Sequence, residues 1–359
     1  MQLDFDDPKT LSRLDPKGMT DLIVGLPEQI EEAYDIGRNA EIPSEYADVK
    51  SVVISGLGGS AIGGDLLRSL TLSESKVPIS VNRDYAIPAY VGPDTLFIAS
   101  SYSGNTEETL SAFEYAVRAG ARILCISSGG ELTRRAAESG IPVVKIPGGP
   151  APRAALGYSF VPLLIIMRRL ELVEGCPQGE DIAEMLSVMR GLREVLGPGA
   201  PESVNHAKQL ARKVYGKLPV IYGSEGYRAV VAQRWKGQVN ENSKAAAYWN
   251  VYPELDHNEI VGWKSNPELL RSMFVINLRD KSESPKMQRR IEVTSEVIAK
   301  YAAGVEDVWA IGKSDLAKLF SLVYIGDFMS LYLAFLNGED PMPVESISYL
   351  KSRLAEVEG

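Results

Sequence analysis

The sequence predicts an α/β protein in which helices cover both faces of parallel β-sheets, arranged as two similar domains. Short apolar runs alternate with segments that have the apolar spacing of helices, which is the pattern of parallel sheets. The stretches VVISGLGGSAIGGDLL and PVIYGSEGYRAVVAQRW both combine a strand, a glycine turn and a helix, so one arrangement occurs twice. The length of 359 residues suits two domains of ordinary size.

The first half of the chain contains five short apolar runs, which we interpret as buried parallel strands. A helical lead-in up to about residue 39 precedes them. Helical segments separate the runs, and one of these places Leu110, Phe113 and Val117 on one face. The expected strands are residues 49–54, 77–81, 96–99, 122–127 and 143–146, and the expected helices end near residue 119 and span 132–139.

The Pro- and Gly-rich segment 148–153 ends this first series, and a long apolar helix is expected at 156–172. We therefore expect an N-terminal domain at 1–172 and a C-terminal domain at 173–359. An amphipathic helix between residues 177 and 201 leads into the second series. Its expected strands are 218–222, 245–252, 273–278 and 306–310, and its expected helices are 227–237, 285–301, 316–336 and 344–354.

The bulk composition excludes several classes of function. A formal net charge of −9 argues against nucleic acid or an anionic membrane as the main partner. Cys125 and Cys176 show no metal-ligand spacing and make a disulfide framework unlikely, so a reducing cytoplasm is the expected location. The apolar stretch 319–336 contains Asp327 and is interpreted as a buried helix, not as a membrane span.

A hydroxyl-rich loop follows the expected strand at 96–99, and we call residues 101–106 the hydroxyl loop. Ser101, Ser103 and Thr106 lie between the carboxyl end of a strand and the amino end of a helix, where open α/β sheets bind ligands. Free backbone N–H groups and the helix dipole attract anions at such a position. The loop is therefore a candidate phosphate site. The alternative is a polar loop in which Asn105 or Ser103 only caps the helix.

A glycine-rich segment, residues 56–64, follows the first expected strand, and we call it the glycine turn. Ser60 and the amides of Gly58 and Gly59 would face the hydroxyl loop, and two adjacent donor-rich turns would form one phosphate-sized site. The same segment matches the loose dinucleotide fingerprint G-x-G-x-x-A, which leaves a nicotinamide or flavin cofactor as an alternative. A third interpretation is a turn needed only for tight packing of strand against helix.

Four further side chains are candidates for chemistry. The guanidinium of Arg153 could stabilise a developing oxyanion, or could form an ordinary salt bridge. Glu241, between two asparagines, could be a general base or a solvated residue at a helix end. His257 suits proton transfer near neutral pH, although a lone histidine is often structural. Lys351 lies on the last expected helix, where lysines are usually solvated. No second histidine lies at ligand spacing from His257, so we expect no metal site.

Five motifs resemble, in one order, those of the bifunctional phosphoglucose/phosphomannose isomerase family, which is built from two sugar isomerase (SIS) domains. The resemblance extends from about residue 51 to residue 354, whereas residues 1–40 and 174–202 match nothing in it. The motifs are GLGGSAIGGD, SYSGNTEET, PRAALGYSF, NENSKAAAYWNVYPELDHNEI and SISYLKSRL.

The resemblance implies two α/β/α domains with flavodoxin-like sheets, and a homodimer whose active sites lie at the subunit interface. It implies isomerisation of glucose 6-phosphate, and of mannose 6-phosphate, to fructose 6-phosphate without a cofactor. A noncatalytic SIS regulator that binds phosphosugars is the alternative. The implied roles are phosphate binding by Ser60, Ser101, Ser103 and Thr106, proton transfer by Glu241, enediolate support by Arg153, and ring opening by Lys351 with the other subunit's His257.

Overall fold

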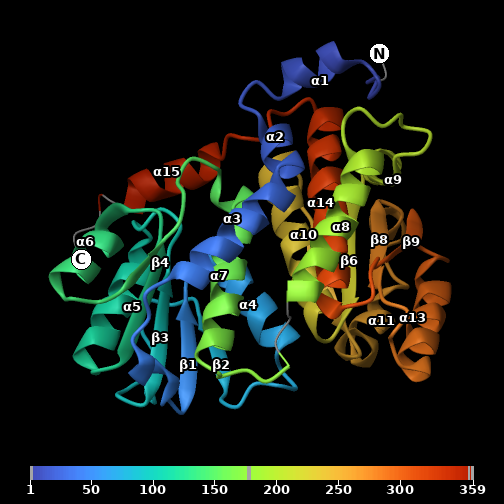
Figure 1. Cartoon of the computed structure of the whole chain (residues 1–359). Coiled ribbons are helices and arrows are strands. Elements are labelled where there is room, and N and C mark those ends of the chain that lie inside the picture. The colour runs from blue at the N-terminus through green and yellow to red at the C-terminus, as the bar shows by residue number, and fades with distance from the viewer. Residues whose placement is uncertain (1–2, 176–178, 355, 357–359) are drawn as a thin grey trace.

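The chain folds around two parallel β-sheets, with a layer of helices between them (Figure 1). The structure is a computed structural model that describes residues 3–175, 179–354 and 356. Before the first strand, the chain forms α1 (Pro8–Leu14), α2 (Met19–Val24), α3 (Leu26–Asn39) and the short 3₁₀ helix η1 (Ser44–Ala47). Cys176 lies outside the described residues, and Cys125 is a buried free thiol.

The first sheet has five parallel strands in the order β2-β1-β3-β4-β5, which is the flavodoxin-like order. The register pairs Ser55 at the end of β1 with Ala99 near the end of β3, so the segments that follow these two strands emerge side by side. The strands are β1 (Ser51–Ser55), β2 (Ile79–Asn82), β3 (Thr95–Ser100), β4 (Arg122–Ser127) and β5 (Val143–Lys145).

Alternating side chains of this sheet enter two different apolar cores, as the two-residue period of a strand requires. Val53 and Phe97 pack against α5 (Glu107–Arg118) and α6 (Gly130–Glu138) on one face. Ile54 and Ile98 face α3, α4 (Gly58–Leu70) and α7 (Leu156–Arg169) on the other, and η2 (Pro152–Ala154) precedes α7.

The second sheet has four parallel strands in the order β7-β6-β8-β9, which repeats the first arrangement without a fifth strand. Helices cover both of its faces. The predicted α/β fold, with two parallel sheets each between helical layers, is therefore confirmed. The elements are β6 (Leu218–Ser224), α10 (Tyr227–Ser243), β7 (Tyr248–Tyr252), η3 (Glu254–His257), α11 (Glu259–Gly262), α12 (Pro267–Leu270), β8 (Met273–Arg279), α13 (Pro285–Ile298) and β9 (Gly304–Trp309).

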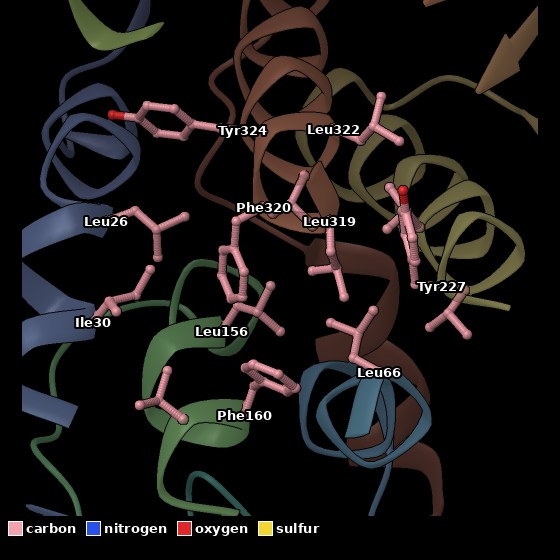
Figure 2. Packing of buried hydrophobic residues seen from close by; sticks show 14 of the residues in the cluster. Leu26, Ile30, Leu66, Leu156, Phe160, Tyr227, Leu319, Phe320, Leu322 and Tyr324 are labelled. Atoms are coloured by element: carbon pink, nitrogen blue, oxygen red, sulfur yellow. The ribbon is translucent and has the colours of Figure 1, made fainter. Parts of the chain in front are cut away.

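The helix α14 (Asp315–Asn337) forms the centre of the molecule and packs against α8 (Gly179–Leu196), α9 (His206–Val214) and α10. It is long and apolar enough to cross a membrane, yet 94% of its most apolar window is buried inside the protein. This agrees with its interpretation as a core helix. Figure 2 shows Phe320 of α14 beside Leu156 and Phe160 of α7, within one core cluster that joins both halves of the chain. The division at residues 172 and 173 stays a prediction.

Two expected boundaries were wrong where glycines were interpreted as turns or helix ends. The helix α4 begins at Gly58, so most of the glycine turn is helical. Gly63 permits this close packing, because a Cβ there would lie 2.7 Å from the carbonyl oxygen of Ser159 in α7. The helix α10 continues six residues past Gly237 and ends at Ser243, where Lys244 adopts a left-handed conformation.

Gly326→Ala should destabilise the protein, because α10 and α14 meet at this glycine. A Cβ at position 326 would lie 2.1 Å from Nε1 of Trp235, a fully buried indole that donates a hydrogen bond to the carbonyl of Leu322. Overpacking of this kind typically costs about 1–3 kcal/mol. Thermal unfolding would measure the loss, with Gly191→Ala in α8, where a Cβ meets nothing within 4 Å, as the control. Equal melting temperatures for the two variants would contradict the prediction.

Candidate active site

A polar hollow of about 200 Å³ lies between the start of α4 and the last three turns of α10. We call it the first hollow. Its cationic side chains outnumber its single carboxylate, so it favours an anionic ligand. It is lined by Gly58, Gly59, Ile62, Arg83, Arg153, Gln233, Arg234, Lys236, Gly237, Gln238, Glu241 and Trp249.

Arg153 is buried at the edge of this hollow, with its side chain 4% exposed. Its Nε donates to Oδ1 of Asn242 at 2.6 Å, and its Nη2 donates to the carbonyls of Pro341 and Met342 at 2.6 and 2.9 Å. Its Nη1 makes a longer bond of 3.3 Å to Oε2 of Glu241. Burial lowers the pKa of the Arg153 guanidinium, and the Glu241 carboxylate opposes this shift. The guanidinium stays charged, since arginine does not deprotonate in proteins.

Glu241 lies in the last turn of α10 and has a side chain that is one-third exposed. It lines the first hollow and also a second hollow, which α10 forms with the start of α15 (Glu345–Leu354). The carboxylate therefore has open space on one side and the Arg153 guanidinium on the other. This arrangement suits a base that must accept a proton from a bound ligand while an adjacent cation stabilises negative charge.

Lys244 helps to fix the segment that leads into α15. Its ammonium donates to the carbonyl of Pro341 at 3.0 Å and to that of Glu241 at 2.5 Å. Burial, together with the charge of Arg153, lowers the pKa of Lys244. The carbonyl of Pro341 thus receives hydrogen bonds from two cations, Arg153 and Lys244, which tie the start of α15 to the end of α10.

The first residues of α4 are held against η2, and this brings the glycine turn to Arg153. A Cβ on Gly59 would lie 2.8 Å from the carbonyl oxygen of Pro152, so only glycine permits the contact. Gly58 has a φ of +52° and open space around its Cβ position. The structure therefore brings Gly58, Gly59, Arg153 and Glu241 together around one hollow.

Hydrogen bonds within the hydroxyl loop hold its conformation. Oγ of Ser101 lies 2.9 Å from Oγ1 of Thr106 and accepts a hydrogen bond from the amide of Gly104. Thr106 is the N-cap residue of α5, and its side chain makes no capping bond. The alternative in which Asn105 or Ser103 caps α5 is therefore wrong. Oδ1 of Asn105 accepts from the amide of Glu131 in α6 instead.

The glycine turn and the hydroxyl loop lie next to each other, since they follow the neighbouring strands β1 and β3. A Cβ on Gly56 would lie 2.7 Å from the carbonyl oxygen of Ser100 and 2.9 Å from Cβ of Ser60. This point between β1 and β3 is the switch point of a flavodoxin-like sheet, where ligands bind. Phosphate binding by Ser60, Ser101, Ser103 and Thr106 stays a prediction, as none of the four lines the first hollow.

His257 does not lie with Glu241 in the same chain. It is exposed at the end of η3, whose Leu255 is buried among residues of α13 and whose Asp256 accepts a hydrogen bond from Thr294 of α13. Because α10 packs on the other face of the second sheet, the sheet separates the two residues. The end of β7, a few residues before His257, accepts a hydrogen bond from the amide of Glu225, which lies next to Tyr227 at the start of α10. Glu241 lies about 20 Å from Tyr227 along α10, so it is far from this point.

Lys351 is exposed on α15, one helical turn beyond Ile347, which lines the second hollow. Residues four apart share a helix face, so the lysine side chain lies on the same face of α15 as Ile347. Figure 1 shows α15 at the upper left and α11, which follows η3, at the lower right. The helix that carries Lys351 and the helix that follows His257 thus lie on opposite sides of the molecule.

Several lining residues were not anticipated from the sequence. Arg234 and Gln238 share one face of α10 with the anticipated Glu241, at positions i, i+4 and i+7, but this signal was hidden because the helix was expected to end at Gly237. Arg83 reaches the hollow from the loop after β2, where it pairs with the carboxylate of Asp65. Among the described residues, no group of three or more His, Cys, Asp or Glu side chains is arranged to hold a metal ion.

Two flavodoxin-like sheets, with a cationic hollow beside the switch point of the first, define an α/β protein suited to binding an anionic ligand. Residues 203–354 match the family described as the bacterial phospho-glucose isomerase C-terminal SIS domain. Among solved structures, the C-terminal domain of a glucosamine-fructose-6-phosphate aminotransferase from Francisella tularensis superposes with a TM-score of 0.70 at 17% identity. That match covers 90% of this chain and 98% of the other, and shows the fold.

Curated relatives narrow the class to a family. A bifunctional phosphoglucose/phosphomannose isomerase from Caldicellulosiruptor bescii is 49% identical, over 94% of this chain and 99% of the relative. Another from Aquifex aeolicus is 36% identical, over 90% of this chain and 97% of the relative. The chain belongs to the bifunctional phosphoglucose/phosphomannose isomerase family.

Proposed function

We propose that this chain interconverts glucose 6-phosphate, and mannose 6-phosphate, with fructose 6-phosphate. The observation that carries the proposal is the pairing of a partly exposed carboxylate, Glu241, with a buried guanidinium, Arg153, in a hollow that the glycine turn borders. Family membership supports the same reaction. A coupled assay with each aldose phosphate tests it directly, and a protein inactive on both would refute it.

In this proposal the hydroxyl loop and the start of α4 bind the sugar phosphate. The hydroxyls of Ser60, Ser101, Ser103 and Thr106 and the amides of Gly58 and Gly59 are the donors. The start of α4 adds the positive end of its helix dipole. Binding of the unreactive phosphate end holds carbons 1 and 2 in position for proton transfer.

Glu241 is the proposed base, which takes the proton from C2 of the open-chain aldose and returns it at C1. Removal of this proton leaves an enediolate, whose negative charge develops on oxygen. Nη1 of Arg153 has only one long bond, to Glu241, and is the part of the guanidinium best placed to stabilise that charge. A positioned base of this kind contributes about 10²–10⁴ in rate.

Ring opening is assigned to His257 and Lys351, with His257 supplied by a second subunit. His257 lies across the second sheet from Glu241 of the same chain, which supports this assignment. The proposed active unit is therefore a homodimer with shared sites. We place the protein in the cytoplasm. We also propose that the boundary between its two domains lies between residues 172 and 173.

A noncatalytic phosphosugar-binding regulator is the second candidate. Such a protein needs only the phosphate donors, whereas a carboxylate beside an arginine at the edge of a hollow serves proton transfer. Phosphosugar binding without turnover of either aldose phosphate would favour the regulator.

Ser103→Ala together with Thr106→Ala should raise KM strongly. Both residues are solvent-accessible, whereas Ser101 is buried. Each lost hydrogen bond to the charged phosphate is worth about 1.5–3 kcal/mol. Initial rates would give KM, and inorganic phosphate should compete with substrate in the parent protein. Ser111→Ala, on a later turn of α5, is the control. An unchanged KM in a folded double variant would refute the phosphate assignment.

A further inference from the structure

A buried polar network connects α14 to Arg153. Asp327 and Ser330 lie one turn apart on α14, with exposed fractions of 3% and 0%, in a helix that is otherwise almost entirely apolar. Within the network, Oγ of Ser330 donates to the carbonyl of Asp327 at 2.9 Å. Buried polar groups of this kind are expensive unless each is hydrogen-bonded, so their partners are informative.

Asp327 fixes the backbone of Arg153 through one intermediate residue. Its carboxylate accepts from Nη2 of Arg234 at 2.7 and 3.0 Å and from Nε2 of Gln238 at 2.7 Å. The same Nη2 of Arg234 donates to the carbonyl oxygen of Arg153 at 3.1 Å. An ion pair between α10 and α14 thus holds the η2 segment that carries Arg153.

Ser330 fixes the side chain of Arg153, again through one intermediate. Its Oγ accepts from Nδ2 of Asn242 at 3.0 Å, and Oδ1 of the same amide accepts from Nε of Arg153 at 2.6 Å. Asn242 is fully buried and uses both ends of its amide in this chain of bonds. Because the donor end is held by Ser330, the acceptor end must face Arg153.

The network leaves one edge of the guanidinium for the ligand. Nε is held by Asn242, and Nη2 by two backbone carbonyls, whereas within the described part of the chain Nη1 makes only the 3.3 Å bond to Glu241. Rotation of the side chain would break several short bonds at once. A donor that is held in place before charge develops stabilises that charge without reorganisation.

We infer that Asn242 and Ser330 are positioning residues for the isomerisation, which hold the Nη1 edge of Arg153 toward the developing enediolate. The inference rests on the role proposed for Arg153. Asn242 acts on the substrate only through Arg153, so its removal should affect the chemical step more than substrate binding. Loss of a preorganised donor of this type costs 10²–10³ in kcat when it is complete, and misalignment should cost on the order of tenfold.

The test is a double-mutant cycle with Asn242→Ala and Arg153→Lys, measured as kcat and KM on glucose 6-phosphate. Alone, Asn242→Ala should lower kcat on the order of tenfold and change KM by less than about twofold. In the Arg153→Lys background the same substitution should lower kcat by less than about twofold, because the residue through which it acts has gone. Ser330→Ala should reproduce the effect more weakly, and it serves if Asn242→Ala does not fold.

Ser243→Ala is the matched control. Ser243 is equally buried, follows Asn242 directly and donates to the carbonyl of the same Ser330 at 2.6 Å, but it makes no bond to Arg153. It should lower the melting temperature and leave kcat unchanged. If Ser243→Ala and Asn242→Ala lower kcat equally, or if Asn242→Ala acts as strongly in the Arg153→Lys background, the network is only structural and the inference fails.

The double-mutant cycle also distinguishes a failure of this inference from a failure of the proposed function. If Arg153→Lys keeps the full kcat, Arg153 has no role in the reaction, and both the role and the inference fall. If Arg153→Lys is strongly impaired while folded Asn242→Ala and Ser330→Ala variants keep the full kcat, the proposed function stands and only the inference is overturned.

Discussion

Glu241→Gln should lower kcat by at least ~10²-fold, the lower part of the range for a general base, while the protein still folds and binds phosphosugar. Glutamine has nearly the same size, and its amide oxygen can still accept the hydrogen bond from Nη1 of Arg153. It cannot accept the substrate proton as a carboxylate does. The loss should therefore appear in kcat, with KM nearly unchanged.

Exchange of the C2 proton of glucose 6-phosphate in deuterated water, followed by NMR, measures the proposed step directly. Exchange should nearly stop in Glu241→Gln, whereas ring opening, which we assign to other residues, should continue. Glu345→Gln is the matched control, because Glu345 lines the second hollow with Glu241 but has no assigned role. Exchange at the parent rate in Glu241→Gln would mean that another residue is the base.

The local sequence was sufficient to predict most of the fold. Short β-rich runs mark buried strands, and the run 122–127 coincides with β4 (Arg122–Ser127). The adjacency of the glycine turn and the hydroxyl loop also follows from the predicted fold, because the strands before them, β1 and β3, are neighbours in a flavodoxin-like sheet. Gly58 and Gly59 of the glycine turn line the same hollow as Arg153 and Glu241, for which the resemblance implied roles.

The parts that could not be predicted depend on contacts between distant segments. The end of α10 was misplaced because glycine disfavours helices locally, whereas packing of α10 against α14 extends the helix past Gly237. Arg234 pairs with Asp327, 93 residues away in the sequence, and Asn242 bonds to Ser330, 88 residues away. Nothing in the spacing of these residues indicates that they meet.

The location of His257 is a case in which closeness in sequence misleads. Only β7 (Tyr248–Tyr252) and short connections separate it from Glu241, yet these connections carry the chain along the sheet and onto its other face. A strand of five residues spans about 17 Å at 3.3 Å per residue. The structure therefore keeps His257 away from Glu241 of the same chain.

Mixing inactive Glu241→Gln and inactive His257→Ala proteins should restore activity. In a heterodimer with shared sites, one site combines both substitutions and the other contains the unsubstituted Glu241 and His257. After random exchange of equal amounts, half of the dimers are mixed and half of their sites are intact, so about a quarter of the parent activity is expected from a twofold-symmetric dimer.

The control replaces the His257→Ala partner with a chain that carries both substitutions. Its mixture with Glu241→Gln contains no intact site under any arrangement and should stay inactive. Subunit exchange can be verified by native mass spectrometry of chains with distinguishable tags. If exchange is complete and activity does not return in the first mixture, His257 serves the site of its own chain after a rearrangement. The shared-site dimer would then be rejected. Recovery in the first mixture alone would assign Glu241 and His257 to one site built from two chains.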